Sequence, residues 1–273
     1  MTFSIVARSV DGNAWGVAVA SKFLAVGAAV PAARAGVGAV ATQSFANTLY
    51  KRDGIDLLRG GHSAQQTLDA LLATDEEREE RQAGIVDAQG RAASWTGKGC
   101  LDWAGGVTGA GYAIQGNILT GPAVVEAMRA AYLAAESSTL PEQLLTALRA
   151  GDAAGGDSRG RQSAALLVVS DSGGYTPGDD LAYDLRVDDH PDPCTELERL
   201  LQLHHIYFDR PADADLLPLD GKLADEVAGH VRRLGYPDLE TWAGVENYEV
   251  RLIDGRIDRF VLDRLREQAD AAP

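Results

Sequence analysis

The order of strand-like and helix-like segments predicts an α+β protein in which two mostly antiparallel sheets face each other, with helices on their outer sides. Groups of strands alternate with pairs of helices, the order expected when sheets and helices form separate layers. A doubly wound fold would instead place one helix between successive strands. A small, mostly helical C-terminal module is expected after this layered domain.

The first strands are predicted at the start of the chain. Residues 2–7 have a strand-like alternation, and the turn signal Asp-Gly-Asn at 11–13 separates them from the apolar run at 15–20. These features predict an antiparallel hairpin whose second strand is buried on both faces. Residues 35–43 predict another strand, in which two glycines indicate close approach of a second backbone.

Helix pairs follow the groups of strands. Residues 49–59 and 63–74 predict the first pair, with Ser63 and Gln66 in capping-box positions. The charge run at 75–81 is predicted to be a solvated helix end or loop. The later elements are a hairpin (82–87 and 91–96), a loop-like segment (97–111), a short strand (112–115), two helices (about 121–135 and 140–150), two strands (163–171 and 182–187) and a helix (193–208).

The pattern near the C-terminus predicts three parts: a main domain at 1–209, a linker at 210–218 and a small module at 219–273. Leu223, Val227 and Val231 in the module repeat at helical spacing. A module of about 55 residues is marginal for independent stability. It is therefore expected to pack on the main domain or on a partner chain.

Composition limits the classes of partner and compartment. The formal charge of −15 and the pI of about 4.7 argue against nucleic acid and against anionic membranes. No stretch approaches the roughly 18 apolar residues of a membrane span, and no signal peptide is recognised, so we expect a cytoplasmic protein. Cys100 and Cys194 are too few for a disulfide framework and are expected to be small buried residues.

The sequence predicts no cofactor and no metal site. The HExxH, CxxC, GxSxG and Walker patterns are missing from it, and the partial glycine fingerprint at 36–41 lacks the helix and the acid of a dinucleotide site. A metal site at Asp188, Asp189 and His190 is the less favoured interpretation, because three adjacent side chains rarely face one ion. An ordinary strand-to-helix turn is expected there.

Thr2 is the candidate nucleophile. It follows Met1, and a methionine before a small residue is generally trimmed, which would leave a threonine with a hydroxyl and a free α-amine. Such an amine has an ordinary pKa of about 7.7–8.0 and can accept the proton as the hydroxyl attacks. The alternative interpretation is that Thr2 simply opens an edge strand.

Further candidate residues, all polar except Gly116, lie at the ends of predicted elements, where sites are commonly built on a rigid scaffold. They are Ser21, Lys22, Arg34, Thr42, Gln43, Asn47, Gln115, Gly116, Asn117, Asp157, Ser158, Arg159, Gln162 and Ser163. Taken singly, each is explained as a cap or a turn residue. Together they offer a nucleophile, cations and amides, the groups that acyl transfer needs.

Several long motifs occur in order along the chain: TFSIVA, WGVAVASKFLAVG, RAGVGAVATQ, QGN and GGDSRGRQSAAL. Through them, residues 2–208 resemble the family called domain of unknown function 1028. That resemblance implies the N-terminal nucleophile (Ntn) hydrolase superfamily and its four-layer αββα sandwich. The tail motifs LPLDGKLADEV, WAGVEN and IDRFVLDRLRE resemble a small module that often follows this family and is named for peptidoglycan binding.

The resemblance also implies roles for residues. Proteasome β-type members of the superfamily begin with a threonine, which Thr2 matches once Met1 is gone. They carry an acid and then a base at the end of the second strand, where this chain has Ser21 and Lys22. Arg34 stands where they have a lysine that lowers the pKa of the nucleophile, and Asp157 matches a later aspartate.

The predicted function is therefore that of an amidohydrolase that cleaves a small amide or peptide-like bond. The expected catalytic residues are Thr2, Lys22, Arg34 and Asp157. The expected substrate or oxyanion residues are Gln43, Asn47, Gly116, Asn117, Arg159 and Ser163. The alternative, favoured by the missing acid, is a non-catalytic small-molecule-binding or assembly protein on the same fold. Apolar strand edges predict a homodimer.

Overall fold

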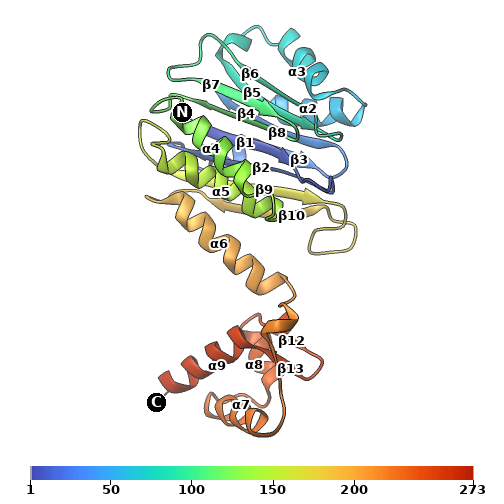
Figure 1. Ribbon diagram of the computed structural model, residues 1–273, viewed down its shortest axis with the longest axis vertical. Coiled ribbons are helices and arrows are strands. Elements are labelled where there is room, and N and C mark those ends of the chain that lie inside the picture. Colours follow the sequence, from blue (N-terminus) through green and yellow to red (C-terminus); the bar gives the residue numbers. More distant parts are fainter. Residues whose placement is uncertain (1, 273) are drawn as a thin grey trace. The chain divides into compact units, whose positions relative to one another are not determined.

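The computed structural model describes residues 2–272, and the chain divides into two units, Met1–Glu198 and Arg199–Pro273. Two antiparallel sheets form the centre of the first unit (Figure 1). The larger sheet has the order β10-β9-β2-β1-β8-β7, with β1 Thr2–Arg8, β2 Ala14–Ser21, β7 Gly105–Gly109, β8 Tyr112–Asn117, β9 Ser163–Ser170 and β10 Leu181–Val187. The smaller sheet has the order β3-β4-β5-β6, with β3 Pro31–Arg34, β4 Gly38–Ser44, β5 Arg81–Asp87 and β6 Ala92–Thr96.

Helices cover the outer face of each sheet (Figure 1). Helices α2 (Leu49–Arg59) and α3 (Ala64–Ala73) contact the smaller sheet, and α4 (Ala123–Ala134) and α5 (Leu140–Ala153) contact the larger one. The short helix α1 (Val26–Ala29) follows β2, and α6 (Pro193–Phe208) follows β10. The expected α+β organisation with antiparallel sheets is confirmed, and the layers run helices, sheet, sheet, helices.

Small and β-branched side chains fill the space between the sheets. Val6, Val17 and Val19 of the larger sheet pack with Ala39 and Ala41 of the smaller one. Because side chains alternate along a strand, the intervening Val40 points the other way, into a second cluster formed with α2 and α3. The predicted capping box of Ser63 and Gln66 is present at the start of α3.

One segment differs from its expectation. Residues 97–111 were predicted as a loop but contain β7, which pairs with β8 at the edge of the larger sheet. The strand sequence GGVTG offers few side chains that could show an alternation. Main-chain hydrogen bonds to β8 therefore define a strand that the side-chain pattern does not indicate.

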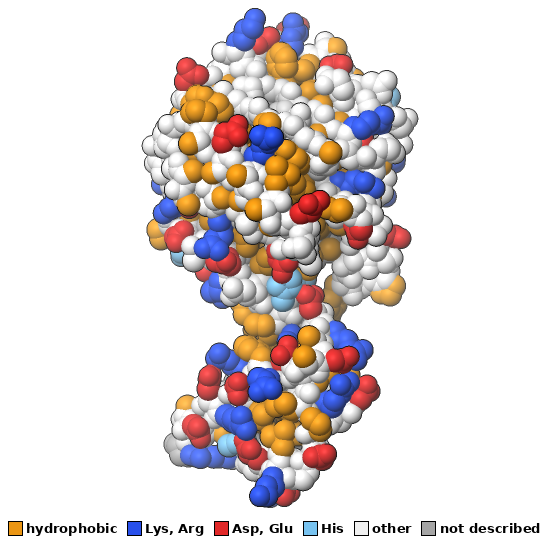
Figure 2. Space-filling view, viewed as in Figure 1, with side chains coloured by type: hydrophobic (Ala, Val, Ile, Leu, Met, Phe, Trp, Pro, Cys, Tyr) orange, Lys and Arg blue, Asp and Glu red, His pale blue; other side chains and the backbone are white. Residues whose placement is uncertain are grey.

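The second unit is small and mostly helical, as expected. Helices α7 (Gly221–Arg233), α8 (Leu239–Val245) and α9 (Arg259–Ala271) accompany a three-stranded sheet of β11 (Leu216–Pro218), β13 (Arg256–Asp258) and β12 (Leu252–Ile253). Trp242 lies at the centre of its core with Val227 and Val231 from the predicted helical repeat. Basic, acidic and apolar side chains are interspersed on the face shown in Figure 2.

The predicted linker 210–218 is structured at its C-terminal end, because β11 lies within it and pairs with β13. The C-terminal turn of α6 also belongs to the second unit. Arg251 donates from Nη1 to the carbonyls of His205 (3.1 Å) and Ile206 (3.3 Å) and forms an ion pair with buried Asp258. The segment is short and rich in proline and aspartate, so its composition resembles that of a linker. A strand of three residues is too short to produce a recognisable alternation in the sequence. No helix within residues 2–272 is long and apolar enough to cross a membrane.

Arg251→Ala is expected to destabilise the second unit by about 3 kcal/mol, because the charge of Asp258 would stay buried without its partner. Thermal or urea unfolding of the full chain measures this loss. Arg256→Ala is the matched control, since Arg256 pairs with the exposed Asp213 and such surface pairs contribute about 1 kcal/mol or less. Equal losses in the two variants would contradict the role given to Arg251.

Candidate functional site

Thr2 begins a central strand of the larger sheet and is nearly buried. Its main chain pairs with Asn117 of β8, and its side chain lies beside the end of β2. The Oγ1 atom of Thr2 is 3.0 Å from Oγ of Ser21, so the two hydroxyls share a hydrogen bond. A hydroxyl that is held at the end of a rigid strand is aimed more precisely than one on a loop.

A cavity of about 860 Å³ opens beside Thr2. Its volume lies within the range of roughly 300–1,000 Å³ that small-molecule sites occupy. It is lined by Thr2, Phe23, Val26, Ala29, Val30, Gln43, Ser44, Phe45, Ala46, Asn47, Thr48, Glu77, Arg81, Leu101, Asn117, Ile118 and Arg159. Phe23, Phe45 and Leu101 are more than half exposed, so the cavity has large apolar side chains at its surface.

Two buried amides hold the carbonyl of Thr2. Gln43 donates from Nε2 at 3.2 Å and Asn117 from Nδ2 at 3.5 Å. The same two nitrogens also donate to Oε1 of Gln82, at 2.8 and 2.9 Å. Gln43 and Asn117, expected to contact substrate or oxyanion, thus line the cavity but already bind the backbone of the candidate nucleophile.

Gln82 fixes the direction of these amides. Its Nε2 donates to the carbonyl of Gly116 (2.8 Å) and to Oγ1 of Thr96 (2.9 Å), so its oxygen must face Gln43 and Asn117. Because Oε1 of Gln82 can only accept, Gln43 and Asn117 must both direct their NH₂ groups toward it. Thr2 is therefore positioned by an uncharged network that joins the two sheets.

The network continues through Ser4 to Gln115. Ser4 donates from Oγ to Oε1 of Gln43 at 2.7 Å and accepts from Nε2 of Gln115 at 2.7 Å. Gly84 on the facing strand makes room for this contact, since a Cβ atom there would lie 2.1 Å from Oε1 of Gln115. Gln115 was among the polar residues noted in the sequence, whereas Gln82 was not, and a glutamine in a short apolar strand is the signal that could have identified it.

Gly84→Ala is expected to destabilise the first unit by about 1–3 kcal/mol, because the added methyl group overpacks a closed site and displaces Gln115. Urea unfolding measures the change. Gly121→Ala is the control, since a Cβ atom there would have no heavy atom within 4 Å. A Gly84→Ala protein as stable as the control would show that the network tolerates the displacement.

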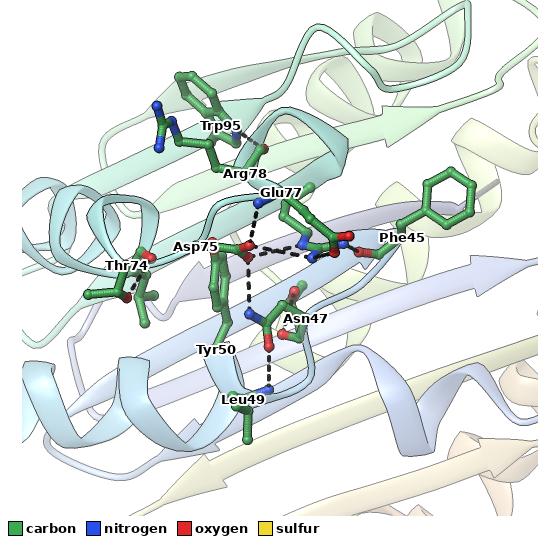
Figure 3. A network of polar contacts seen from close by, with 12 residues as sticks. Phe45, Asn47, Leu49, Tyr50, Thr74, Asp75, Glu77, Arg78 and Trp95 are labelled. Atoms are coloured by element: carbon green, nitrogen blue, oxygen red, sulfur yellow. Dashed lines mark hydrogen bonds and ion pairs between the residues drawn. The ribbon is translucent and has the colours of Figure 1, made fainter.

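A charged cluster builds another wall of the cavity (Figure 3). Asp75 accepts hydrogen bonds on Oδ2 from Nε of Arg81, Nδ2 of Asn47 and the hydroxyl of Tyr50, each at 3.0 Å. Arg81 also donates to the carbonyl of Phe45 at 2.6 Å, which ties the segment after β4 to β5. The charge run at 75–81, predicted as solvated, therefore contains a buried ion pair of Asp75 and Arg81.

Burial alone would raise the pKa of Asp75, but hydrogen bonds from Arg81, Asn47 and Tyr50 hold it well below its ordinary value. Burial and the hydrogen bond to the Asp75 carboxylate raise the pKa of Tyr50. Asp75 is thus ionised and Tyr50 is neutral near neutral pH. Asn47, expected as a substrate or oxyanion residue, uses its amide nitrogen on this carboxylate and lines the cavity as part of the wall.

Asp157 lies in the loop between α5 and β9, and its side chain contacts Lys22, the residue that follows β2. Its buried carboxylate accepts from the backbone nitrogens of Lys22 (2.7 Å) and Arg159 (2.9 Å). The guanidinium of Arg159 is 3.5 Å from the same carboxylate and lines the cavity. The Lys22 side chain is exposed, and its ammonium donates to the carbonyl of Arg161 at 3.2 Å. Asp157 and Arg159 therefore lie at the site, whereas the Lys22 ammonium is used elsewhere.

Arg34 does not reach Thr2, contrary to expectation. It pairs with Gly38 at one end of β4, while Gln43, which contacts Thr2, is near the other end. The rise of a strand over residues 38–43 separates these positions by about 16 Å. The register of β3 against β4 places Arg34 away from Thr2, and this register cannot be read from the sequence.

Two further expected site residues have packing roles. Ser163 is fully buried, accepts from the backbone nitrogen of Val26 at 3.1 Å and donates to the carbonyl of Phe23, so it shapes the turn after β2. Gly116 pairs with Phe3, and a Cβ atom there would lie 2.4 Å from Leu119. Neither residue is among those that line the cavity.

Strained backbone marks the rim of the same cavity. Ser44, the last residue of β4, and Ile118, the residue after β8, have φ angles of 72° and 51°. A non-glycine residue in this region costs roughly 1–3 kcal/mol and persists where the surroundings impose it. The strain at both positions belongs to the segments that carry Gln43 and Asn117.

The residues of the less favoured metal interpretation form a turn. His190 accepts on Nδ1 from the backbone nitrogen of Asp192 at 3.0 Å, and Asp189 accepts from Gln162 at 3.1 Å. Within residues 2–272, no group of three or more His, Cys, Asp or Glu side chains is arranged to hold a metal ion.

Comparisons with known proteins agree with the division into two units. Residues 2–197 match the model of a family described as "Family of unknown function (DUF1028)", and residues 207–265 match one described as "Putative peptidoglycan binding domain". No curated protein matches the chain. The crystal structure of protein SPO2555 from Silicibacter pomeroyi, a DUF1028 protein, is similar with 31% identity and a TM-score of 0.67, over 82% of this chain and 92% of that one. The chain therefore belongs to the DUF1028 family, a family of unknown function, and carries a second matched domain at its C-terminal end.

Proposed function

We propose that the first unit is an amidohydrolase of the Ntn type, in which Thr2 is the nucleophile once its α-amine is free. The observation that carries the proposal is the placement of Thr2: its hydroxyl is held at the end of a central strand, beside a cavity of about 860 Å³. The order of layers, two sheets between two pairs of helices, agrees with the αββα sandwich of that superfamily.

The reaction would proceed through an acyl-enzyme. The Thr2 oxygen attacks the amide carbonyl while its α-amine takes the hydroxyl proton. That proton then passes to the leaving nitrogen as the C–N bond breaks, which leaves an ester on Thr2. Water attacks the ester, which releases the carboxylic acid and regenerates the free Thr2 hydroxyl. The Ser21 hydroxyl, at 3.0 Å, orients the Thr2 oxygen for the first step.

The neighbouring residues position the nucleophile. Gln43 and Asn117 clamp its carbonyl, and Gln82 sets their orientation. Asp157 holds the backbone of Lys22, the residue after Ser21, and so fixes the end of β2. Rigid support of this kind is what keeps a reacting atom within about 0.5 Å of a productive geometry.

A non-catalytic binding protein is the second candidate. The observation that favours it is the placement of the two expected cations: the Lys22 ammonium donates to Arg161, and Arg34 lies at the far end of β4. Neither side chain has a contact that directs its charge at the Thr2 hydroxyl. In this reading the cavity binds a small molecule and leaves it unchanged.

The two candidates differ in what a free α-amine does. Protein produced with Thr2 as its first residue is compared with protein that retains a residue before Thr2, on a panel of small amides followed by mass spectrometry. The proposal predicts turnover only in the first form. Binding without turnover in both forms would favour the non-catalytic candidate.

A further inference from the structure

A second cavity, of about 310 Å³, lies in the first unit at the opposite end of β1 from Thr2. Arg8, the last residue of β1, lines it, and the rise of the strand over residues 2–8 places Arg8 about 20 Å from Thr2. The turns before β6 and between β7 and β8, the C-terminal end of α4 and the first turn of α5 also contribute to the lining. The volume is at the lower end of the roughly 300–1,000 Å³ that small-molecule sites occupy.

Two buried polar side chains in this lining have no hydrogen-bond partner. Gln143 is 3% exposed and Tyr132 is 7% exposed, yet within residues 2–272 neither the amide nor the hydroxyl forms a hydrogen bond. The neighbouring Tyr112, by contrast, accepts on its hydroxyl from Nε of Arg129 at 3.3 Å. Buried side-chain polar groups are paired in the large majority of cases. Two unpaired groups that line one cavity therefore indicate a ligand that supplies their partners.

Arg8 adds a cation whose charge no carboxylate neutralises by contact. Within residues 2–272 it forms no ion pair, and its Nε is buried with no acceptor. The guanidinium carbon lies 5.5 Å from the centre of the Trp15 ring, a cation–π contact that holds the side chain in place. Hydrogen bonds from Ser9 and Asn13 lower the pKa of Asp11, and the charge of Arg8 is a smaller cause of the same shift. Arg8 therefore brings to the cavity a guanidinium that is held in place and unpaired.

These groups are suited to an anionic ligand. Burial raises the pKa of Tyr132 to about 12, so its hydroxyl keeps its proton near neutral pH and can donate, as can the Gln143 amide and the Arg8 guanidinium. A carboxylate matches the planar fork of a guanidinium and accepts several such bonds. A phosphate monoester carries nearly two negative charges, whereas the lining offers one cation, Arg8, and one acid, the exposed Glu136. A ligand with a single negative charge is therefore favoured.

We propose that this cavity binds a small monocarboxylate with a short apolar chain. The carboxylate pairs with Arg8, and the Tyr132 hydroxyl and the Gln143 amide donate to the same polar head. The apolar chain packs against Leu133, which lines the cavity and is 49% exposed. Nothing in this assignment depends on the reaction proposed for Thr2.

Butyrate, butyramide and inorganic phosphate are the probes, and their binding to the full-length protein is measured by NMR titration near neutral pH. Butyrate and butyramide are nearly equal in size and differ in charge. We expect butyrate to bind about tenfold to a hundredfold more tightly than butyramide, the range of charge-assisted hydrogen bonds, and phosphate to bind more weakly than butyrate. Equal binding of butyrate and butyramide overturns the proposal without any variant, and tighter binding of phosphate overturns the choice of a monocarboxylate.

Arg8→Gln is expected to abolish the preference for butyrate over butyramide. Arg129→Gln is the matched control, because Arg129 is a cation on α4 with 45% of its side chain exposed but does not line the cavity. Unfolding temperatures are measured for both variants. A preference that survives Arg8→Gln, or an equal loss in the two variants, overturns the proposal.

Tyr132→Phe keeps the ring and removes the hydroxyl alone, and it is expected to weaken butyrate binding about tenfold. Tyr112→Phe is the matched control: Tyr112 is also buried, and its ring centre is 5.2 Å from that of Tyr132, but it does not line the cavity. Butyrate binding that is unchanged by Tyr132→Phe would overturn the placement of the carboxylate.

Thr2→Ala protein separates this site from the proposed reaction. Since the two sites are about 20 Å apart along β1, butyrate should bind this variant as it binds the unaltered protein. Binding that is lost in Thr2→Ala and kept in Arg8→Gln would place the acid beside Thr2 and overturn the proposal. A butyrate preference that depends on Arg8, in protein that begins at Thr2 and hydrolyses no amide, would support this site and overturn the amidohydrolase.

Discussion

Thr2→Ala is expected to reduce amide hydrolysis by more than about 10³-fold, since the acyl-enzyme has no oxygen on which to form. The variant should still fold, because the Thr2 carbonyl, which Gln43 and Asn117 bind, is main chain and stays in place. Turnover of a responsive amide and the unfolding temperature are measured together. Unchanged hydrolysis in a folded variant would remove Thr2 from the mechanism.

Two conservative variants test the details of this role. Thr2→Ser keeps a hydroxyl at the same position and is expected to retain activity. Ser21→Ala removes the hydroxyl at 3.0 Å and is expected to lower kcat by roughly tenfold, the value of one orienting hydrogen bond of about 1.4 kcal/mol. A Ser21→Ala protein with full kcat would show that the Thr2 side chain is oriented by its other contacts.

Asp75→Ala is expected to cost about 4–5 kcal/mol of unfolding free energy, the upper part of the range for a broken buried ion pair. The variant leaves buried Arg81 with the exposed Glu77 as its ion-pair partner and also removes the acceptor for Asn47 and Tyr50. Urea unfolding measures the loss. Asp53→Ala is the control, because Asp53 pairs with Arg52 on the surface and should cost about 1 kcal/mol or less.

The same carboxylate gives stability a defined pH dependence. The pKa of Asp75 is lower in the folded chain than the roughly 3.9 expected of an unfolded one. Its stabilisation is therefore complete above about pH 4 and is lost as pH falls through the lower folded value. The Asp75→Ala protein should lose less unfolding free energy than the unaltered protein as the pH falls below about 4. A parallel decline in the two proteins would contradict the role of Asp75.

Local features of the first unit could be predicted from the sequence, because short-range signals specify them. The capping box of Ser63 and Gln66 and the hairpin around 11–13 depend on residues a few positions apart. The position of Arg34 depends on strand register instead, and no local pattern states which end of β4 it reaches. A site residue carried over by position alone was therefore misplaced.

The buried polar groups were missed for a different reason. Asp75 and Arg81 occur in a run of charges that is typical of solvated segments, and only the fold brings them together out of water. Gln115 is expected at the end of a short strand and Gln82 at the start of a hairpin strand, and neither position shows that the side chain faces the other sheet. Their contacts join two sheets, so they become visible only when the sheets are stacked.

Peptide mapping of the trapped acyl-enzyme tests the central claim most directly. Protein that begins at Thr2 is mixed with an activated acyl donor, quenched in acid and digested, and the modified peptide is identified by mass spectrometry. The account predicts that the acyl group is on the Thr2 oxygen and is missing from Thr2→Ala protein. An adduct on another residue in a hydrolysing protein, or full hydrolysis by protein that retains a residue before Thr2, would contradict it.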